Sequence, residues 1–357
     1  MKRLELTDYA RFFAAMMVVL FHYTFNGIAN GKISSIPMDN DIANITKYGY
    51  LGVELFFMIS GYVIFYSAKM RTASQFAFSR VLRLFPSYWF AVIFTSVFIY
   101  FLGNEKITTD IKTTLINLTM LQSFLGAKDV DGVYWTLIFE LKFYFVIFVF
   151  LLLGLQSKLD LLIKTWALMI FIINISNLGN YPLLSGYFSY FIAGALLSIA
   201  RDTKSIITYT LLLMMFYCSI TFSINHANIV NLKENIDYNT TVTGVLISLF
   251  FLFFLFQNTK YAQNLSLPLS TILGAIVYPL YLLHAHIGYM LLDKFANGSN
   301  RTLLTVIIIF FAITIAYLTH VIIEKKCSPT WKYLFGLFVA KPIEGIEKRL
   351  YKKTEES

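Results

Sequence analysis

Long apolar runs recur along this 357-residue chain, and they constrain its fold more than any other feature. Each run has about 16 to 23 residues, close to the roughly 20 that an α-helix needs to cross a bilayer. The run at 250–256 contains only Phe and Leu, so it lacks the alternation of a transmembrane barrel strand. Charged residues make up 14% of the chain, whereas a soluble domain has about 25%. The sequence therefore predicts an all-α, polytopic transmembrane helical bundle.

Ten spans are expected, joined by short loops, with no internal repeat. They are 8–28, 49–68, 86–103, 134–154, 160–175, 181–199, 205–224, 240–257, 270–292 and 303–323. The apolar segment 112–125 is short and rich in Thr, so we expect a surface or re-entrant stretch, with an eleventh span as the alternative. The membrane-embedded domain would cover residues 1–324. Residues 325–357 would form a polar, basic tail.

The net charge of +9 is explained by where Lys and Arg fall. With the N-terminus inside, the inner loops and tail hold about twice as many Lys and Arg as the outer loops, so the positive-inside rule predicts that both termini are cytoplasmic. No basic stretch is interleaved with aromatic residues, so we expect no nucleic-acid partner. The first apolar run contains Arg11 and lacks a small-residue cleavage site, which favours a retained helix over a signal peptide.

The chain shows no pattern typical of a metal or redox site. Its two cysteines, Cys218 and Cys327, have no such spacing; one lies in an apolar run and the other follows the last span, so we expect no disulfide. His-Glu-x-x-His, Gly-x-Ser-x-Gly and phosphate-binding glycine motifs are missing from the sequence. We therefore expect neither a metal nor those chemistries.

Arg11 and His22 lie in the first apolar run. Eleven helical steps of about 100° bring the two side chains within about 20° of each other, roughly 16 Å apart along the axis. An ionisable residue inside a span is costly, and it is therefore a candidate for function. Two structural alternatives remain open: the Arg11 side chain extends to the membrane–water interface beside Asp8, and His22 is a hydrogen-bonded core residue.

Three more ionisable residues are expected in the outer half of the bundle with His22. Glu54 begins the second span, Glu140 lies about two turns below the outer surface, and His284 falls late in the ninth span. The alternative for Glu54 is a structural role at the start of a helix, where the helix dipole stabilises a negative charge. Glu140 needs a partner because a buried carboxylate is costly.

Cations are expected in the inner half. Arg80 and Arg83 are neighbours on one helix face and would join Arg11. Planar guanidinium groups suit phosphate. The alternative is that both residues lie in a cytoplasmic loop, where the positive-inside rule favours Lys and Arg. This arrangement suits a charged cytosolic donor that delivers a group to an acceptor at the outer face.

Six segments, in this order, resemble motifs of acyltransferase family 3, the integral-membrane acyltransferases that include bacterial O-antigen and exopolysaccharide O-acetylases. They are Arg11 with His22, the segment 51–61 (LGVELFFMISG), Arg80 with Arg83, the segment 135–140 (WTLIFE) with Phe143 and Tyr144, the segment 278–284 (YPLYLLH), and Ile323 with Glu324. The resemblance covers nearly the whole chain. Lys325 and Lys326 stand where the family commonly has Arg-Pro, and we expect no Gly-Asp-Ser hydrolase domain after this segment.

The resemblance implies O-acylation, most simply transfer of acetyl from acetyl-CoA to a hydroxyl of a cell-surface glycan or its lipid-linked precursor. His22 would be the base, supported by Glu54 or Glu140, and Arg11, Arg80 and Arg83 would hold the donor. Substrate contacts would come from Trp135, Tyr144, Tyr281 and His284.

The protein would lie in the bacterial plasma membrane, in contact with lipid, and the sequence carries no indication of its oligomeric state. Two alternatives remain open. One is acyl transfer to a lipid or small molecule; the other is a glycan or lipid-linked transporter, for which matching broken helices in two related halves would be expected.

Overall fold

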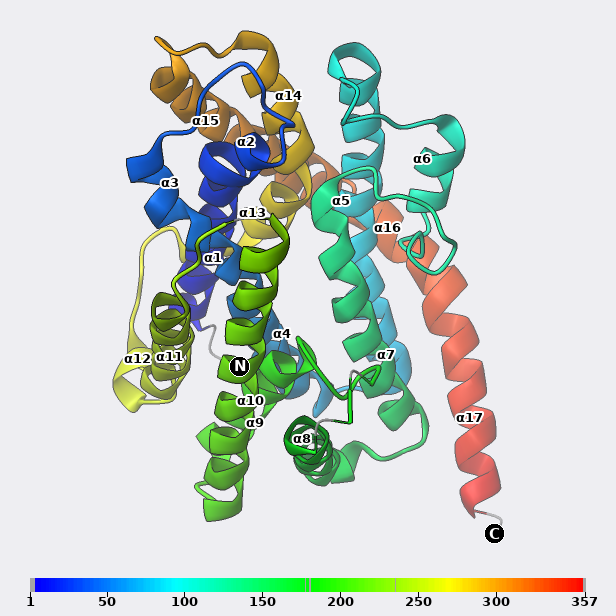
Figure 1. Ribbon diagram of the computed structural model, residues 1–357. Helices are drawn as coiled ribbons and strands as arrows, with labels where there is room; N and C mark the ends of the chain where they lie inside the picture. Colours follow the sequence, from blue (N-terminus) through cyan, green and yellow to red (C-terminus); the bar gives the residue numbers. More distant parts are fainter. Residues whose placement is uncertain (1–3, 177, 180, 235, 356–357) are drawn as a thin grey trace.

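The computed structural model describes residues 4–355 except 177, 180 and 235, and the part it describes contains helices and no β-strand. Figure 1 shows the helices gathered side by side, with the C-terminal helix leading away from the others at the lower right. This confirms the predicted all-α class.

The first half of the chain supplies the helices that carry most of the candidate residues. They are α1 (Glu5–Phe21), the π-helical segment η1 (His22–Asn26), α2 (Gly27–Ala29), α3 (Asn40–Thr46), the 3₁₀ segment η2 (Lys47–Leu51), α4 (Gly52–Ala68), α5 (Ala73–Leu102), α6 (Ile111–Asn117), the 3₁₀ segment η3 (Gly132–Thr136) and α7 (Leu137–Leu152).

The second half completes the bundle. Its elements are the 3₁₀ segment η4 (Gln156–Lys158), α8 (Leu159–Ile175), α9 (Phe188–Asp202), α10 (Ile206–Glu234), α11 (Thr240–Gln257), α12 (Lys260–Asn264), α13 (Ser270–Leu283), α14 (Ala285–Phe295), α15 (Arg301–Thr319), the π-helical segments η5 (His320–Lys326) and η6 (Gly336–Ala340), α16 (Ser328–Phe335) and α17 (Lys341–Glu355).

Seven helical segments in the described residues are long and apolar enough to cross a membrane, and α13 with α14 brings the number to eight if that bent pair is one span. The seven are Glu5–Ala29, Asn40–Ala68, Ala73–Leu102, Gly132–Leu152, Ile206–Glu234, Thr240–Gln257 and Arg301–Lys326. The other two predicted spans correspond to α8 and α9. These helices have 17 and 15 residues, fewer than the roughly 20 needed for a full crossing. The segment 112–125 contains all but the first residue of the short helix α6, followed by turns, as a surface stretch would.

Two helices differ from the predicted spans in a way that matters for the site. The span predicted over 270–292 is broken at His284, where α13 and α14 meet at 63°; Pro279 within α13 lacks the N–H of a regular helix. The span predicted at 86–103 begins at Ala73, because Thr72 and Gln75 form a capping box there and the helix continues through Pro86. Arg80 and Arg83 therefore belong to the spanning helix α5.

Helix α4 packs closely on α9 because glycines on both helices leave room for the neighbouring backbone. A Cβ atom added to Gly61 would lie 1.9 Å from the carbonyl oxygen of Phe191, and one added to Gly194 would lie 2.0 Å from that of Met58. Such small residues are typical of close helix contacts in membranes. This contact fixes α4, which carries Glu54, in the middle of the bundle.

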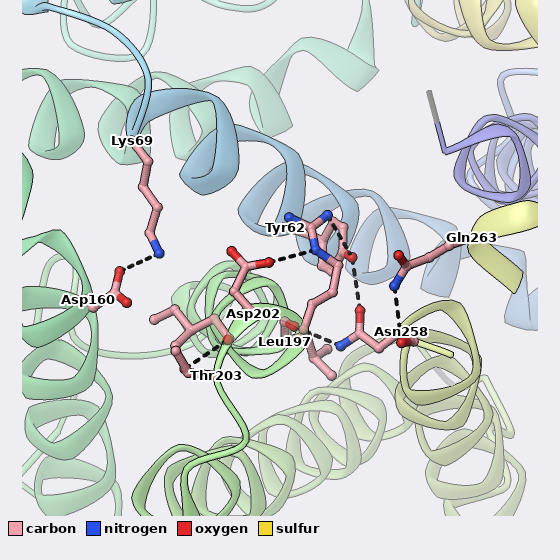
Figure 2. Close-up of polar contacts among 10 residues, drawn as sticks. Tyr62, Lys69, Asp160, Leu197, Asp202, Thr203, Asn258 and Gln263 are labelled. Carbon is pink, nitrogen blue, oxygen red and sulfur yellow. Dashed lines mark hydrogen bonds and ion pairs between the residues drawn. The ribbon is translucent and has the colours of Figure 1, made fainter. Parts of the chain in front are cut away.

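Polar contacts secure the end of α4 opposite Glu54. Figure 2 shows Tyr62 donating to Asn258 Oδ1 (2.9 Å), while Asn258 donates to the carbonyl oxygen of Leu197 (2.8 Å). Lys69 forms an ion pair with Asp160 at 2.7 Å. These contacts connect α4 with α9, the end of α11 and α8, so four helices are held together near this end.

The segment predicted as a polar tail is helical and is attached to α5. Glu347 on α17 is buried, and its Oε1 accepts the backbone N–H of Ala73 at 2.7 Å. Ser74 donates to the carbonyl oxygen of Ala340 at 3.0 Å. The carboxylate thus satisfies a free N–H group at the start of α5.

Candidate active site

Two adjoining cavities hold all the predicted site residues except His284. The arginine cavity has a volume of about 120 Å³ and is lined by Arg11, Arg80, Arg83, Glu140 and Tyr144 among others. The histidine cavity has a volume of about 620 Å³, and its lining includes His22, Glu54, Trp135, Asn26, Lys32 and Tyr289. The structure therefore separates the predicted residues into two groups that belong to neighbouring spaces.

Aromatic rings hold the cations of the arginine cavity in place. The Arg80 guanidinium lies 5.6 Å from the ring centre of Tyr144, and that of Arg83 lies 5.8 Å from the ring centre of Tyr278. Such cation–π contacts orient a guanidinium without neutralising its charge. Arg11 forms an ion pair with Asp8 at 3.5 Å and also lines the cavity. Arg11 therefore lines the cavity while it is paired with Asp8.

Glu140 lies in the arginine cavity, not with His22 as its predicted depth indicated. Its Oε1 accepts hydrogen bonds from the hydroxyl groups of Tyr144 and of Ser60, the latter at 3.3 Å. Tyr144 follows Glu140 by one helical turn, so both side chains share the face of α7 that meets Arg80 on α5. The prediction of Glu140 beside the histidine is therefore wrong, because depth along a helix does not specify which way the side chain faces.

His22 begins the π-helical segment η1, a distortion often found at functional sites. Its Nδ1 contacts the hydroxyl of Tyr289, and Asn26 donates to that hydroxyl at 2.9 Å. Within the described residues, no carboxylate hydrogen-bonds to the imidazole. The predicted carboxylate partner is thus replaced by a phenol and an amide, because the break between α13 and α14 turns Tyr289 towards η1.

Glu54 is the carboxylate that shares the cavity with His22. Its side chain is only 2% exposed, and its Oε2 has no hydrogen-bond partner among the described residues. It lies in the first turn of α4, where the helix dipole favours a negative charge. An unsatisfied buried oxygen is costly, so Glu54 is available to accept a hydrogen bond from a bound substrate.

His284 lines neither cavity, but its ring lies against that of His22. The His284 ring centre lies 5.1 Å from that of His22, and its Nδ1 is 2.8 Å from the carbonyl oxygen of Tyr281, which makes Nδ1 the protonated nitrogen. Its Nε2 is buried and has no partner among the described residues. Tyr281 lines both cavities, whereas Trp135 lines only the histidine cavity.

Sequence reasoning missed Asn26, Tyr289 and Lys32. Asn26 follows His22 by four residues, a spacing that indicates a shared helix face, but nothing in the sequence links Tyr289 to it. Lys32 Nζ lies 3.0 Å from Nε2 of His286, whose Nδ1 donates to the carbonyl oxygen of Val130. Burial lowers the pKa of the Lys32 ammonium group. Lys32 thus adds to the histidine cavity an amino group that is less readily protonated than that of an exposed lysine.

Several apolar helices that could span a membrane, with ionisable side chains facing interior cavities, define a multi-pass membrane protein with a buried polar site. A family model described as an acyltransferase domain matches residues 7–321. The chain therefore belongs to acyltransferase family 3, as the motifs predicted.

One curated relative is nodulation protein 10 of Rhizobium leguminosarum bv. viciae, with 28% identity over 156 residues. The match covers 38% of this chain and 41% of that protein. No solved structure matches the chain significantly.

Proposed function

We propose that this membrane acyltransferase moves an acetyl group from acetyl-CoA to a hydroxyl of a cell-surface polysaccharide or of its lipid-linked precursor, in the bacterial plasma membrane. The observation that carries the proposal is the contact between the two cavities. Three guanidinium groups line one cavity, the imidazole of His22 lines the other, and both spaces are bounded by Val53 and Tyr281. A donor and an acceptor could thus meet between them.

The arginine cavity is the proposed donor site. Arg11, Arg80 and Arg83 face the same small space, and guanidinium groups bind phosphate oxygens through paired N–H donors. Coenzyme A carries several phosphates, so one cluster of cations suits its charge. The proposal places this cavity on the cytoplasmic side, together with both termini, because acetyl-CoA is a cytosolic donor.

His22 is the proposed general base. The hydroxyl of Tyr289 can accept from Nδ1–H of His22 as well as from Asn26. That tautomer leaves a lone pair on Nε2. The acceptor oxygen attacks the thioester carbonyl carbon while Nε2 takes its proton; the C–S bond then breaks, and the departing thiolate takes the proton to give free coenzyme A and the acetyl ester. Glu54 in the same cavity is the proposed acceptor for another substrate hydroxyl.

Mass spectrometry of surface polysaccharide and lipid from cells with and without the gene tests the proposal. We expect the glycan to lose an acetyl-sized group when the gene is deleted, and a plasmid copy to restore it. A loss in lipid alone would instead assign a lipid acceptor. Reduced export with unchanged modification would assign a transporter and contradict the proposal.

A further inference from the structure

The arginine and histidine cavities have two lining residues in common, Val53 of α4 and Tyr281 of α13. Both side chains are buried, at 9% and 8% exposure. They belong to α4 and α13, and each forms part of the wall of both cavities, so a group that passes from one cavity to the other passes beside them. We infer that Val53 and Tyr281 form a constriction that selects the length of the transferred acyl chain, an inference that rests on the proposed function.

Tyr281 is held in one position by contacts on its hydroxyl and its ring. The hydroxyl lies 2.8 Å from Thr136 Oγ1 and 3.3 Å from the carbonyl oxygen of Val133. The ring of Phe56 packs edge-on against it with 5.6 Å between ring centres. Because these contacts come from η3 and α4, the ring cannot turn aside without breaking a buried hydrogen bond, which makes it a rigid wall.

Val53 provides the facing wall at the start of α4. It stands next to Glu54, whose helix is fixed by close packing against α9 through Gly61 and Gly194. A branched side chain at this position has few rotamers. The boundary is therefore apolar on the Val53 side and stiff on both sides.

The chemistry of the two cavities requires the acyl group to lie at this boundary. The cations that would hold the donor phosphates lie on the arginine side, and His22 lies on the other side. The thioester carbonyl must come within reach of both the acceptor oxygen and His22, so its alkyl chain lies beside Val53 and Tyr281. An apolar site discriminates against one additional methylene by about 10- to 200-fold.

The test uses membrane vesicles from cells that produce the full chain and their own surface glycan. Acetyl-CoA, propionyl-CoA and butyryl-CoA are supplied separately, and glycan acylation is measured by mass spectrometry. We expect Val53→Ala to raise the propionyl-to-acetyl ratio by about tenfold. Tyr281→Phe keeps the ring but loses its anchoring hydroxyl, so it should raise the same ratio by a smaller factor.

Val92→Ala is the matched control, because Val92 is buried and lines neither of the two cavities. The propionyl-to-acetyl ratio of this variant should stay within about twofold of the wild-type ratio. Acetyl transfer with equal ratios in Val53→Ala and Val92→Ala would overturn the constriction and leave the proposed function intact. If wild-type vesicles transfer no acyl group from any of the three donors, the proposed function fails and the constriction with it.

Discussion

The hydroxyl of Tyr289 contacts Nδ1 of His22, although the two residues are 267 positions apart. Asn26 donates to the same hydroxyl. The imidazole is therefore oriented by neutral groups, and a neutral partner stabilises an imidazolium less than a carboxylate does. A proton taken by His22 would thus be released readily to the leaving thiolate.

Tyr289→Phe removes this contact while it keeps the ring. Loss of one hydrogen bond that orients the base should lower the maximal rate of acetyl transfer by about tenfold. The Michaelis constant for acetyl-CoA should change little, since Tyr289 does not line the arginine cavity. Initial rates in vesicles at varied acetyl-CoA provide the measurement. Tyr317→Phe on α15, where the side chain is 45% exposed, is the control; equal rates in both variants would contradict the role of Tyr289.

His22→Ala should reduce acetyl transfer by at least about 100-fold, because a positioned base contributes that much or more. The amount of protein in the membrane should stay normal, as His22 is only partly buried and lines a cavity. Immunoblotting of membranes and mass spectrometry of the glycan would establish both points. Transfer near the wild-type level would remove His22 from the mechanism.

Arg80→Gln and Arg83→Gln should each raise the Michaelis constant for acetyl-CoA by about tenfold, since each removes a charge-assisted contact to phosphate. Lys at either position should restore binding only in part, because it lacks the planar pair of donors. Arg301→Gln serves as the matched variant: Arg301 pairs with Asp39 at 2.5 Å, away from the arginine cavity. A similar increase for Arg301→Gln would indicate a general effect of charge.

Gly61→Ala and Gly194→Ala should each destabilise the protein by about 1 to 3 kcal/mol, because the added methyl group would force α4 and α9 apart. Thermal unfolding in detergent would show the lowered midpoint. At Gly244 no heavy atom lies within 4 Å of an added Cβ, so Gly244→Ala should not lower the midpoint. Unchanged unfolding midpoints for Gly61→Ala and Gly194→Ala would show that α4 and α9 can move apart without a loss of stability.

The fold class and the family were predictable from local features of the chain. Apolar runs of spanning length indicate membrane helices whatever their neighbours are. The spacing of Arg11 and His22 predicts a shared face, and in the structure Arg11 lines the arginine cavity whereas His22 lines the histidine cavity. The number of spans was less predictable, since the apolar runs at α8 and α9 form helices of only 17 and 15 residues.

Which residues meet depended on packing between distant segments. Glu140 lines the arginine cavity and not the histidine cavity because of the rotation of α7, and Tyr289 reaches His22 because the chain bends by 63° at His284. The spacing of residues along a helix shows which side chains share a face, but it does not show which neighbouring helix that face contacts. The rotation of each helix about its own axis follows from close contacts such as those of Gly61 and Gly194, and these arise only when the bundle assembles.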